Sequence, residues 1–279
     1  MGQFEASRPA RPPDTRVGEV PWAAIGLVLM AGLLLSGCAP AAAPTCGAES
    51  SSCLRVLFLG NSYTYVNDLP GTFAQLAQAG SHQVETGMVA NGGEMLGEHV
   101  ASSETKDRLA SQKWSYVVLQ EQSDTPAFES GRTQQMYPAA RSLVAMVTPT
   151  GATPIFFMTW AHRDGEPSGG LPGYESMQVQ IDDAYITIAD ELAVPVAPVG
   201  YTWFVVRRQH PEIGLWQDDG SHPNQAGTYL AACVFYATIY RQSPEGLTYR
   251  GGVSEAVAST LQAAAAHEVL SSPEEWNLR

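Results

Sequence analysis

Residues 54–64 read LRVLFLGNSYT, and this stretch decides the expected fold of the chain. The apolar run at 55–59 ends at Gly60, a pattern typical of a buried strand in a parallel sheet. A helical pattern follows at 69–79. The stretch therefore predicts the first strand–turn–helix unit of an α/β domain, with Ser62 in the turn.

The same alternation continues toward the C-terminus. Further strands are expected at 84–89, 116–119, 154–158 and 194–199. Further helices are expected at 96–111, 134–147, 174–192, 224–241 and 253–270. Short apolar strands separated by helices predict a three-layer α/β/α sandwich around a central, mostly parallel five-stranded sheet. Ligands bind such sheets beyond the carboxyl ends of the strands, so functional residues are expected there.

The composition limits the class of protein. The 279 residues carry 15 Lys and Arg against 28 Asp and Glu, which gives a formal net charge of −13. This acidity argues against a nucleic-acid partner and against docking on anionic lipid by charge, because both need clustered basic residues. Hydrophobic residues make up 44% of the chain, enough for a sizeable core.

The N-terminal segment is expected to serve targeting. An apolar stretch at 23–35 has the length of a secretory core segment and runs directly into Leu-Ser-Gly-Cys at 35–38. These four residues resemble a bacterial lipobox, in which cleavage precedes the cysteine and its thiol then carries lipid. We therefore expect a lipoprotein signal peptide at 1–37, a lipidated Cys38 with a flexible tether at 38–53, and a domain at 54–279. The alternative is an uncleaved anchor with an incidental cysteine.

Either interpretation places the domain outside the cytoplasm, held at a bacterial membrane through its N-terminal lipid or anchor. Cys46 and Cys53 flank six residues, and in an exported protein this spacing allows a small disulfide loop at the start of the domain. Cys233 lies in an apolar helical stretch and is expected to be a buried thiol.

Polar segments follow several of the expected strands. They read GNSYT at 60–64, NGGE at 91–94, QEQS at 120–123 and, near the C-terminus, DGSHP at 219–223. Each alone is most often a turn or a helix cap. Together they supply a hydroxyl, backbone N–H donors and a carboxylate–imidazole pair at the carboxyl ends of the strands. This combination predicts nucleophilic catalysis, because a serine hydroxyl reacts readily only when a neighbouring base takes its proton.

The residue types suggest a role for each group. Ser62 is the expected nucleophile, and His222 is the expected base near neutral pH. Asp219 is expected to orient the imidazole, with Asp218 as a rival at the adjacent position. The backbone N–H groups of Ser62 and Gly93 are expected to stabilise the oxyanion.

The order of these segments resembles the SGNH/GDSL hydrolase superfamily over about residues 54–245. That family takes serine from its first block, glycine from its second, asparagine from its third and Asp-x-x-His from its fifth. The resemblance implies a flavodoxin-like fold and the roles above for Ser62, Gly93, Asp219 and His222. GGxxLxxH at 92–99 and LQEQS at 119–123 resemble a less characterised branch found in exported bacterial proteins.

The third block departs from the family pattern, since the expected Gly-x-Asn-Asp is absent. Gln122 is the expected replacement for the asparagine donor, with Gln120 as the second choice. Losing one oxyanion donor typically costs about 10²–10³ in rate, so this block decides how well the site works.

Other polar or aromatic residues near the strand ends are candidates for substrate contacts. Trp160 either offers a platform to a sugar ring or packs in the core, and His99 is expected to order the loop after Gly93. The candidate contacts are Asn61, Asn91, Gln120, Trp160 and His162. No metal and no other cofactor is expected, because the sequence has neither metal-ligand spacing nor a GxGxxG after a strand.

The sequence thus predicts a serine esterase that hydrolyses carboxylic esters through an acyl-enzyme on Ser62. The resemblance implies substrates from acetylated polysaccharides to lipids. The polar loop at 160–164 and the lack of a long apolar lid favour short acyl groups on carbohydrate or other small polar alcohols. The alternatives are an O-acetyltransferase of cell-envelope polysaccharide, a non-catalytic ligand-binding lipoprotein, and a flavodoxin-like domain holding phosphate at 60–64.

Overall fold

The computed structural model describes residue 46 and residues 53–278. The expected signal peptide, the lipid-bearing Cys38 and most of the tether lie outside these residues. Within the described part of the chain, no helix is long and apolar enough to cross a membrane. A disulfide joins Cys46 to Cys53, which confirms the small loop expected at the start of the domain.

Five parallel strands form the central sheet, in the order β2-β1-β3-β4-β7. They are β1 (Cys53–Gly60), β2 (Gln83–Ala90), β3 (Tyr116–Leu119), β4 (Thr153–Phe157) and β7 (Val196–Ala197). A small antiparallel hairpin of β5 (Gly165–Glu166) and β6 (Leu171–Pro172) forms a second sheet. The expected parallel five-stranded sheet is confirmed.

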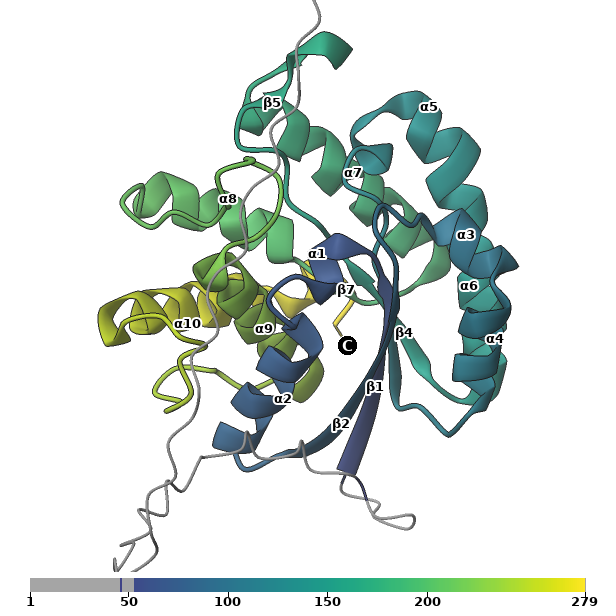
Figure 1. Cartoon of the computed structure of the whole chain (residues 1–279), viewed down its shortest axis with the longest axis horizontal. Helices are drawn as coiled ribbons and strands as arrows, with labels where there is room; N and C mark the ends of the chain where they lie inside the picture. The colour runs from purple at the N-terminus through teal and green to yellow at the C-terminus, as the bar shows by residue number, and fades with distance from the viewer. Residues whose placement is uncertain (1–45, 47–52, 279) are drawn as a thin grey trace, which may run out of the picture. The chain divides into compact units, whose positions relative to one another are not determined.

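Helices cover both faces of the sheet (Figure 1). On one face lie α2 (Leu69–Ala79), α8 (Val199–Gln209), α9 (Gln225–Tyr240) and α10 (Glu255–Leu270). On the other lie α3 (Leu96–Ala101), α4 (Ser103–Ala110), α6 (Tyr137–Val147) and α7 (Tyr174–Leu192). The short helices α1 (Ser62–Tyr65) and α5 (Glu129–Gly131) follow β1 and β3. This arrangement is the expected three-layer sandwich.

Helix α9 forms the centre of one layer. All of its residues from Ala226 to Ile239 are buried, because the sheet, α2, α8 and α10 surround it. Its Phe235 ring lies 5.3 Å from Phe58 of β1 and 5.0 Å from Phe157 of β4, both edge to face. Cys233 is fully buried as expected, and burial raises the pKa of its thiol.

The structure corrects two of the expected elements. The helix expected at 96–111 is two helices, because the Ser102 side chain accepts a hydrogen bond from Thr105 N (3.2 Å) and caps the start of α4. The strand expected at 194–199 is only β7, and α8 begins directly after Pro198. Residues 199–206, VGYTWFVV, favour a strand by local propensity, yet packing against α9 and α10 makes them helical.

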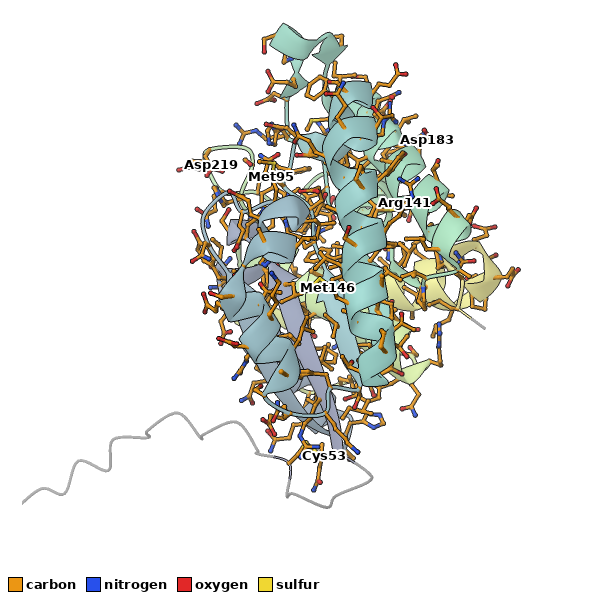
Figure 2. The ribbon with its side chains drawn as sticks, turned by 90° about the vertical axis from the view of Figure 1, so that its right-hand side faces the viewer. Cys53, Met95, Arg141, Met146, Asp183 and Asp219 are labelled. Atoms are coloured by element: carbon orange, nitrogen blue, oxygen red, sulfur yellow. A yellow bond between two sulfur atoms is a disulfide. The ribbon has the colours of Figure 1, made fainter. Side chains whose placement is uncertain are left out.

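The sheet has a topological switch point at β1. From β1 the chain moves outward to β2 and then returns to β3 on the other side of β1, so the strand order reverses there. Ligands of such sheets bind at this switch point, beyond the carboxyl ends of the strands. Figure 2 shows Asp219 and Met95 at the end of the domain opposite Cys53, where β1 begins.

Candidate active site

A tight turn after β1 presents Ser62 as the first residue of α1. The Asn61 side chain accepts a hydrogen bond from Tyr63 N at 3.1 Å and so caps this short helix. Gly60 has no room for a Cβ, because the Gln120 and Thr64 side chains lie against it. The local sequence therefore sets the position of the Ser62 hydroxyl at the strand end.

Ser62, His222 and Asp219 form a continuous hydrogen-bond chain. Ser62 Oγ lies 2.9 Å from His222 Nε2, and His222 Nδ1 lies 2.6 Å from Asp219 Oδ2. The other carboxylate oxygen, Oδ1, accepts from the backbone N–H groups of Ser221 (2.9 Å) and His222 (3.0 Å). Burial opposes ionisation of Asp219, but these N–H groups and the imidazole together lower its pKa. Asp219 rather than the exposed Asp218 contacts the imidazole.

This geometry selects one form of neutral His222. The carboxylate accepts the proton on Nδ1, so Nε2 has a free lone pair facing the Ser62 hydroxyl. The arrangement is able to take a proton from Ser62 as its oxygen attacks an electrophile.

The loop that carries Asp219 and His222 is fastened to its surroundings. Gly220 O accepts from Arg163 N at 2.7 Å, and Ser221 O accepts from Trp160 Nε1 at 2.9 Å. The Ser221 hydroxyl shares a 2.8 Å hydrogen bond with Tyr63 OH, beside the nucleophile. This hydrogen bond joins the loop of Asp219 and His222 directly to the turn that carries Ser62, which we call the nucleophile turn.

Trp160 is fully buried, so the suggestion that it forms a sugar platform is wrong. Its ring stacks between Tyr63 and Trp203, with centroid distances of 4.4 and 4.1 Å. Neither face of the ring is open to a ligand. Trp160 instead supports Tyr63 and holds the loop of Asp219 and His222 through Ser221.

The second polar segment forms a turn with Gly93 at its tip. Gly93 has φ +72°, which favours glycine, and Glu94 N donates to Asn91 O at 3.2 Å to close the turn. The Glu94 carboxylate accepts from Asn91 N (3.0 Å) and Asn91 Nδ2 (2.9 Å). Asn91 thus orders the turn, and Gly93 lines the same pocket as Ser62.

The two glutamines of the third segment have different surroundings. Gln120 is fully buried, and its Oε1 accepts from Asn61 N (2.8 Å) and Thr64 Oγ1 (2.9 Å). Its Nε2 donates to Asn61 Oδ1 (2.9 Å) and Glu121 O (2.6 Å). All of these contacts point inward, so Gln120 is neither a substrate contact nor an oxyanion donor. It positions Asn61.

Gln122 instead lines the pocket beside Ser62 and Gly93. Its Oε1 accepts from Asp124 N at 2.8 Å and from Thr125 N at 3.1 Å. These bonds fix which end of the amide carries the N–H groups, and Nε2 lies 3.0 Å from Ser123 Oγ. Of the two glutamines, Gln122 is the one that lines this pocket.

The pocket around these groups has a volume of about 350 Å³. Sequence reasoning did not single out Tyr63, Tyr65, Ser123 and Ser221, although all four belong to or directly follow the quoted polar segments. Asn61 also lies in its wall, with Nδ2 donating to Glu94 O at 2.9 Å. The lining residues are Asn61, Ser62, Tyr63, Tyr65, Gly92, Gly93, Gln122, Ser123, Ser221 and His222.

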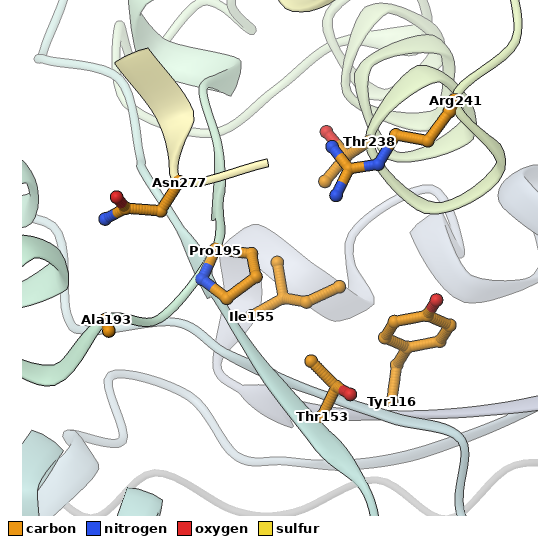
Figure 3. Close-up of a pocket in the computed structure, with 8 residues that line it drawn as sticks. All are labelled: Tyr116, Thr153, Ile155, Ala193, Pro195, Thr238, Arg241 and Asn277. Carbon is orange, nitrogen blue, oxygen red and sulfur yellow. The ribbon is translucent and has the colours of Figure 1, made fainter. Parts of the chain in front are cut away.

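A second pocket, of about 380 Å³, lies at the opposite edge of the sheet (Figure 3). It contains none of the predicted site residues. Tyr116 and Thr153, the first residues of β3 and β4, lie in its wall together with Arg241.

His162 precedes Arg163, which contacts the loop of Asp219 and His222, and its ring lies between two carboxylates. Its Nε2 is 3.4 Å from Asp124 Oδ1, and its Nδ1 is 3.8 Å from Glu166 Oε2. Ligand atoms of these three residues lie within 4.8 Å of one another, the spacing that a shared metal ion would need. His162 and Glu166 stand four residues apart in one loop, and Asp124 comes from a distant segment. His162 does not line the pocket around Ser62.

His99 is buried behind the nucleophile turn. Its Nε2 donates to Gly60 O at 3.0 Å, and its Nδ1 accepts from the Thr105 hydroxyl at 3.0 Å. Burial lowers the pKa of His99, which suits a neutral ring in these two bonds. As expected, His99 orders the loops and does not face the pocket.

Comparison with known proteins gives matches among solved structures. No protein-family model matches the sequence, and no curated protein matches it. A protein from Slackia heliotrinireducens assigned to the SGNH hydrolases is 29% identical, covers 66% of this chain and 97% of its own, and has a TM-score of 0.55.

Two further structures share the fold at lower identity. A DUF4886 family protein from Bacteroides uniformis has a TM-score of 0.69 at 19% identity, over 78% of this chain and 95% of its own. A variant of an acetyl-xylooligosaccharide esterase from Geobacillus stearothermophilus has a TM-score of 0.51 at 16% identity, over 66% of this chain and 92% of its own.

Proposed function

We propose that this chain, a member of the SGNH/GDSL hydrolase superfamily, is a serine esterase acting through an acyl-enzyme on Ser62. One observation carries the proposal. The hydroxyl of Ser62, the imidazole of His222 and the carboxylate of Asp219 are linked by hydrogen bonds of 2.9 and 2.6 Å at the switch point of the sheet.

In the proposed reaction, Ser62 Oγ attacks the ester carbonyl carbon while its proton passes to His222 Nε2. The carbonyl oxygen gains negative charge and faces the N–H groups of Ser62 and Gly93 and the Gln122 amide. The tetrahedral intermediate collapses as His222 returns the proton to the leaving alcohol. Water then repeats the sequence on the acyl-enzyme and releases the carboxylic acid.

The walls of the pocket support a short acyl group and a polar alcohol. Three of its lining residues, Tyr63, Ser123 and Ser221, carry hydroxyl groups, and its volume is about 350 Å³. A long acyl chain gains less where polar groups interrupt the apolar wall, because its binding depends on burying apolar surface against apolar groups. The structural similarity to an acetyl-xylooligosaccharide esterase supports the same preference.

We also propose that the protein is held outside the cytoplasm by lipid on Cys38. The lipobox-like sequence at 35–38 supports this location. The disulfide between Cys46 and Cys53 supports an oxidising compartment, since cytosolic thiols are kept reduced. Labelled palmitate should enter the wild-type chain but not the Cys38→Ala variant. Equal labelling of both chains would contradict the anchor.

Hydrolysis of p-nitrophenyl acetate, butyrate and octanoate tests the activity. The full-length chain in detergent is compared with Ser62→Ala and with Ser142→Ala, an exposed serine on α6. We expect activity to be lost only in Ser62→Ala and to fall with acyl length. Equal activity in wild type and Ser62→Ala would refute the esterase, and a preference for octanoate would refute the short-acyl pocket. Acetyl transfer to an added glycan exceeding hydrolysis would make the protein a transferase.

A further inference from the structure

Glu121 is a buried carboxyl group without a cationic partner. It follows β3, its side chain is fully shielded from solvent, and no ion pair to it is found among residues 53–278. Burial raises its pKa to about 7. Burying an unpaired acid destabilises a fold, and such groups cluster at functional sites.

The contacts of Glu121 explain what the group does. Its Oε1 accepts from two backbone N–H groups, those of Gln122 at 2.7 Å and Leu96 at 3.2 Å. Its Oε2 has no hydrogen-bond partner. A single oxygen atom therefore joins the segment after β3 to the segment after β2.

These two segments carry the proposed oxyanion donors that lie outside the nucleophile turn. Gln122 is one of them, and Leu96 begins α3 three residues after Gly93. Without a direct link, the loop after β2 and the loop after β3 would be free to move relative to each other. The shared acceptor, Glu121 Oε1, holds Gln122 and the Gly93 turn at a constant separation.

We propose that Glu121 is a positioning residue that holds the Gln122 and Gly93 oxyanion donors in register through its single shared oxygen. The inference rests on the proposed esterase function. It also accounts for the departure of this chain from the family's third block. In LQEQS, Gln120 fixes the nucleophile turn, Glu121 joins the two donor loops, and Gln122 supplies the donor.

The role predicts different outcomes for two substitutions at this position. Glu121→Gln keeps an oxygen that accepts from both N–H groups and places its amide nitrogen where Oε2 has no partner. Glu121→Met has a similar length but offers no acceptor. Because donors act mainly on the transition state, we expect Glu121→Met to lose about 10²-fold in kcat with KM changed by less than about threefold. We expect Glu121→Gln to retain kcat within about threefold of wild type.

A structural role alone would not produce this pattern. Gln262 on α10 is a matched control, because it is also buried and its Oε1 also accepts a backbone N–H, that of Gly246 at 3.1 Å. Gln262→Met should lower the unfolding midpoint without lowering kcat per folded molecule. A boronic acid, which forms a tetrahedral adduct on Ser62, gives a second measurement. The Ki of the boronic acid should rise in Glu121→Met by the same factor by which kcat falls.

The experiment measures kcat, KM and the boronic acid Ki for wild type, the two Glu121 variants and Gln262→Met, with circular dichroism to establish folding. Unchanged kcat in Glu121→Met would overturn the proposal, and so would an equal loss in Glu121→Gln. If Glu121→Met does not fold, Glu121→Asp replaces it, since the shorter side chain cannot reach both N–H groups. Retained kcat in Glu121→Asp would also overturn the proposal. A separate comparison of the activity of wild type with that of Ser62→Ala tests the esterase function itself.

Discussion

Replacing Asp219 by asparagine tests the reasoning about the hydrogen-bond chain most directly. In the native site, Oδ1 accepts from Ser221 N and His222 N, and Oδ2 accepts from His222 Nδ1. An asparagine has one oxygen, and the two backbone N–H groups require it. Its NH₂ group must then face Nδ1 and can only donate to it.

This reversal moves the proton of the neutral His222 ring from Nδ1 to Nε2. With Nδ1 accepting, the neutral ring carries its proton on Nε2, which then cannot accept from Ser62 at 2.9 Å. The loss of the correct tautomer costs about 10⁴ in kcat in triads of this kind. KM and the unfolding midpoint should change little, because the two backbone bonds of the loop remain.

The assay is steady-state hydrolysis of p-nitrophenyl acetate by wild type, Asp219→Asn and Asp218→Asn. Asp218 is the matched control, since it is the adjacent aspartate and lies exposed on the same loop. The control should retain wild-type kcat. Retention of more than about a tenth of kcat in Asp219→Asn, or an equal loss in the control, would refute the tautomer argument.

Three other measurements test separate parts of the structure. Gln122→Ala should lower kcat by about 10²–10³ with little change in KM, as steady-state kinetics will show; an unchanged kcat would remove it from the oxyanion site. Because the pKa of Glu121 rises from its ordinary value of 4.5 to about 7, the folded state holds a proton that the unfolded chain has released between these pH values. Glu121 should therefore make the free energy of unfolding fall with rising pH across this window by about 1.4 kcal/mol per unit, or about 3 kcal/mol in all. Urea titrations from pH 5 to 8 should show a shallower dependence in Glu121→Gln, with the contribution of Asp182, whose pKa burial also raises to about 7, remaining in both chains. Equal slopes in wild type and variant would contradict the buried Glu121 carboxyl. Trp160→Ala should cost about 3–5 kcal/mol in urea unfolding, whereas Trp160→Phe keeps a stacked ring and loses about 1 kcal/mol with the bond to Ser221 O; similar costs would argue against the stack.

The proposed triad could be predicted from sequence because its parts are local. Ser62 follows an apolar strand directly, and Asp219 and His222 stand three residues apart in one loop. A parallel sheet then gathers its strand ends at one edge, so long-range geometry is implied by strand order alone. The positions of β1, β2, β3 and β4 follow from the same short apolar runs, whereas the run at 194–199 contains only the two residues of β7.

Features that depend on packing between distant segments could not be predicted in this way. Nothing local distinguishes Gln120 from Gln122, and only Asn61 and Thr64, far away in sequence, show that Gln120 faces inward. Trp160 was open to two interpretations because its burial depends on Trp203 of α8, a helix whose sequence favours a strand. The role of Glu121 likewise depends on Leu96.

The length of β1 separates the start of the domain from the pocket around Ser62. The strand is eight residues long, begins at the disulfide-bonded Cys53 and ends at Gly60, two residues before Ser62. At about 3.3 Å per residue, some 25 Å of protein separates the point where the chain enters the domain from the reacting hydroxyl. A domain held at its Cys53 end would present the pocket away from the surface that holds it. Such an orientation suits polymers that extend past the membrane better than esters embedded in it.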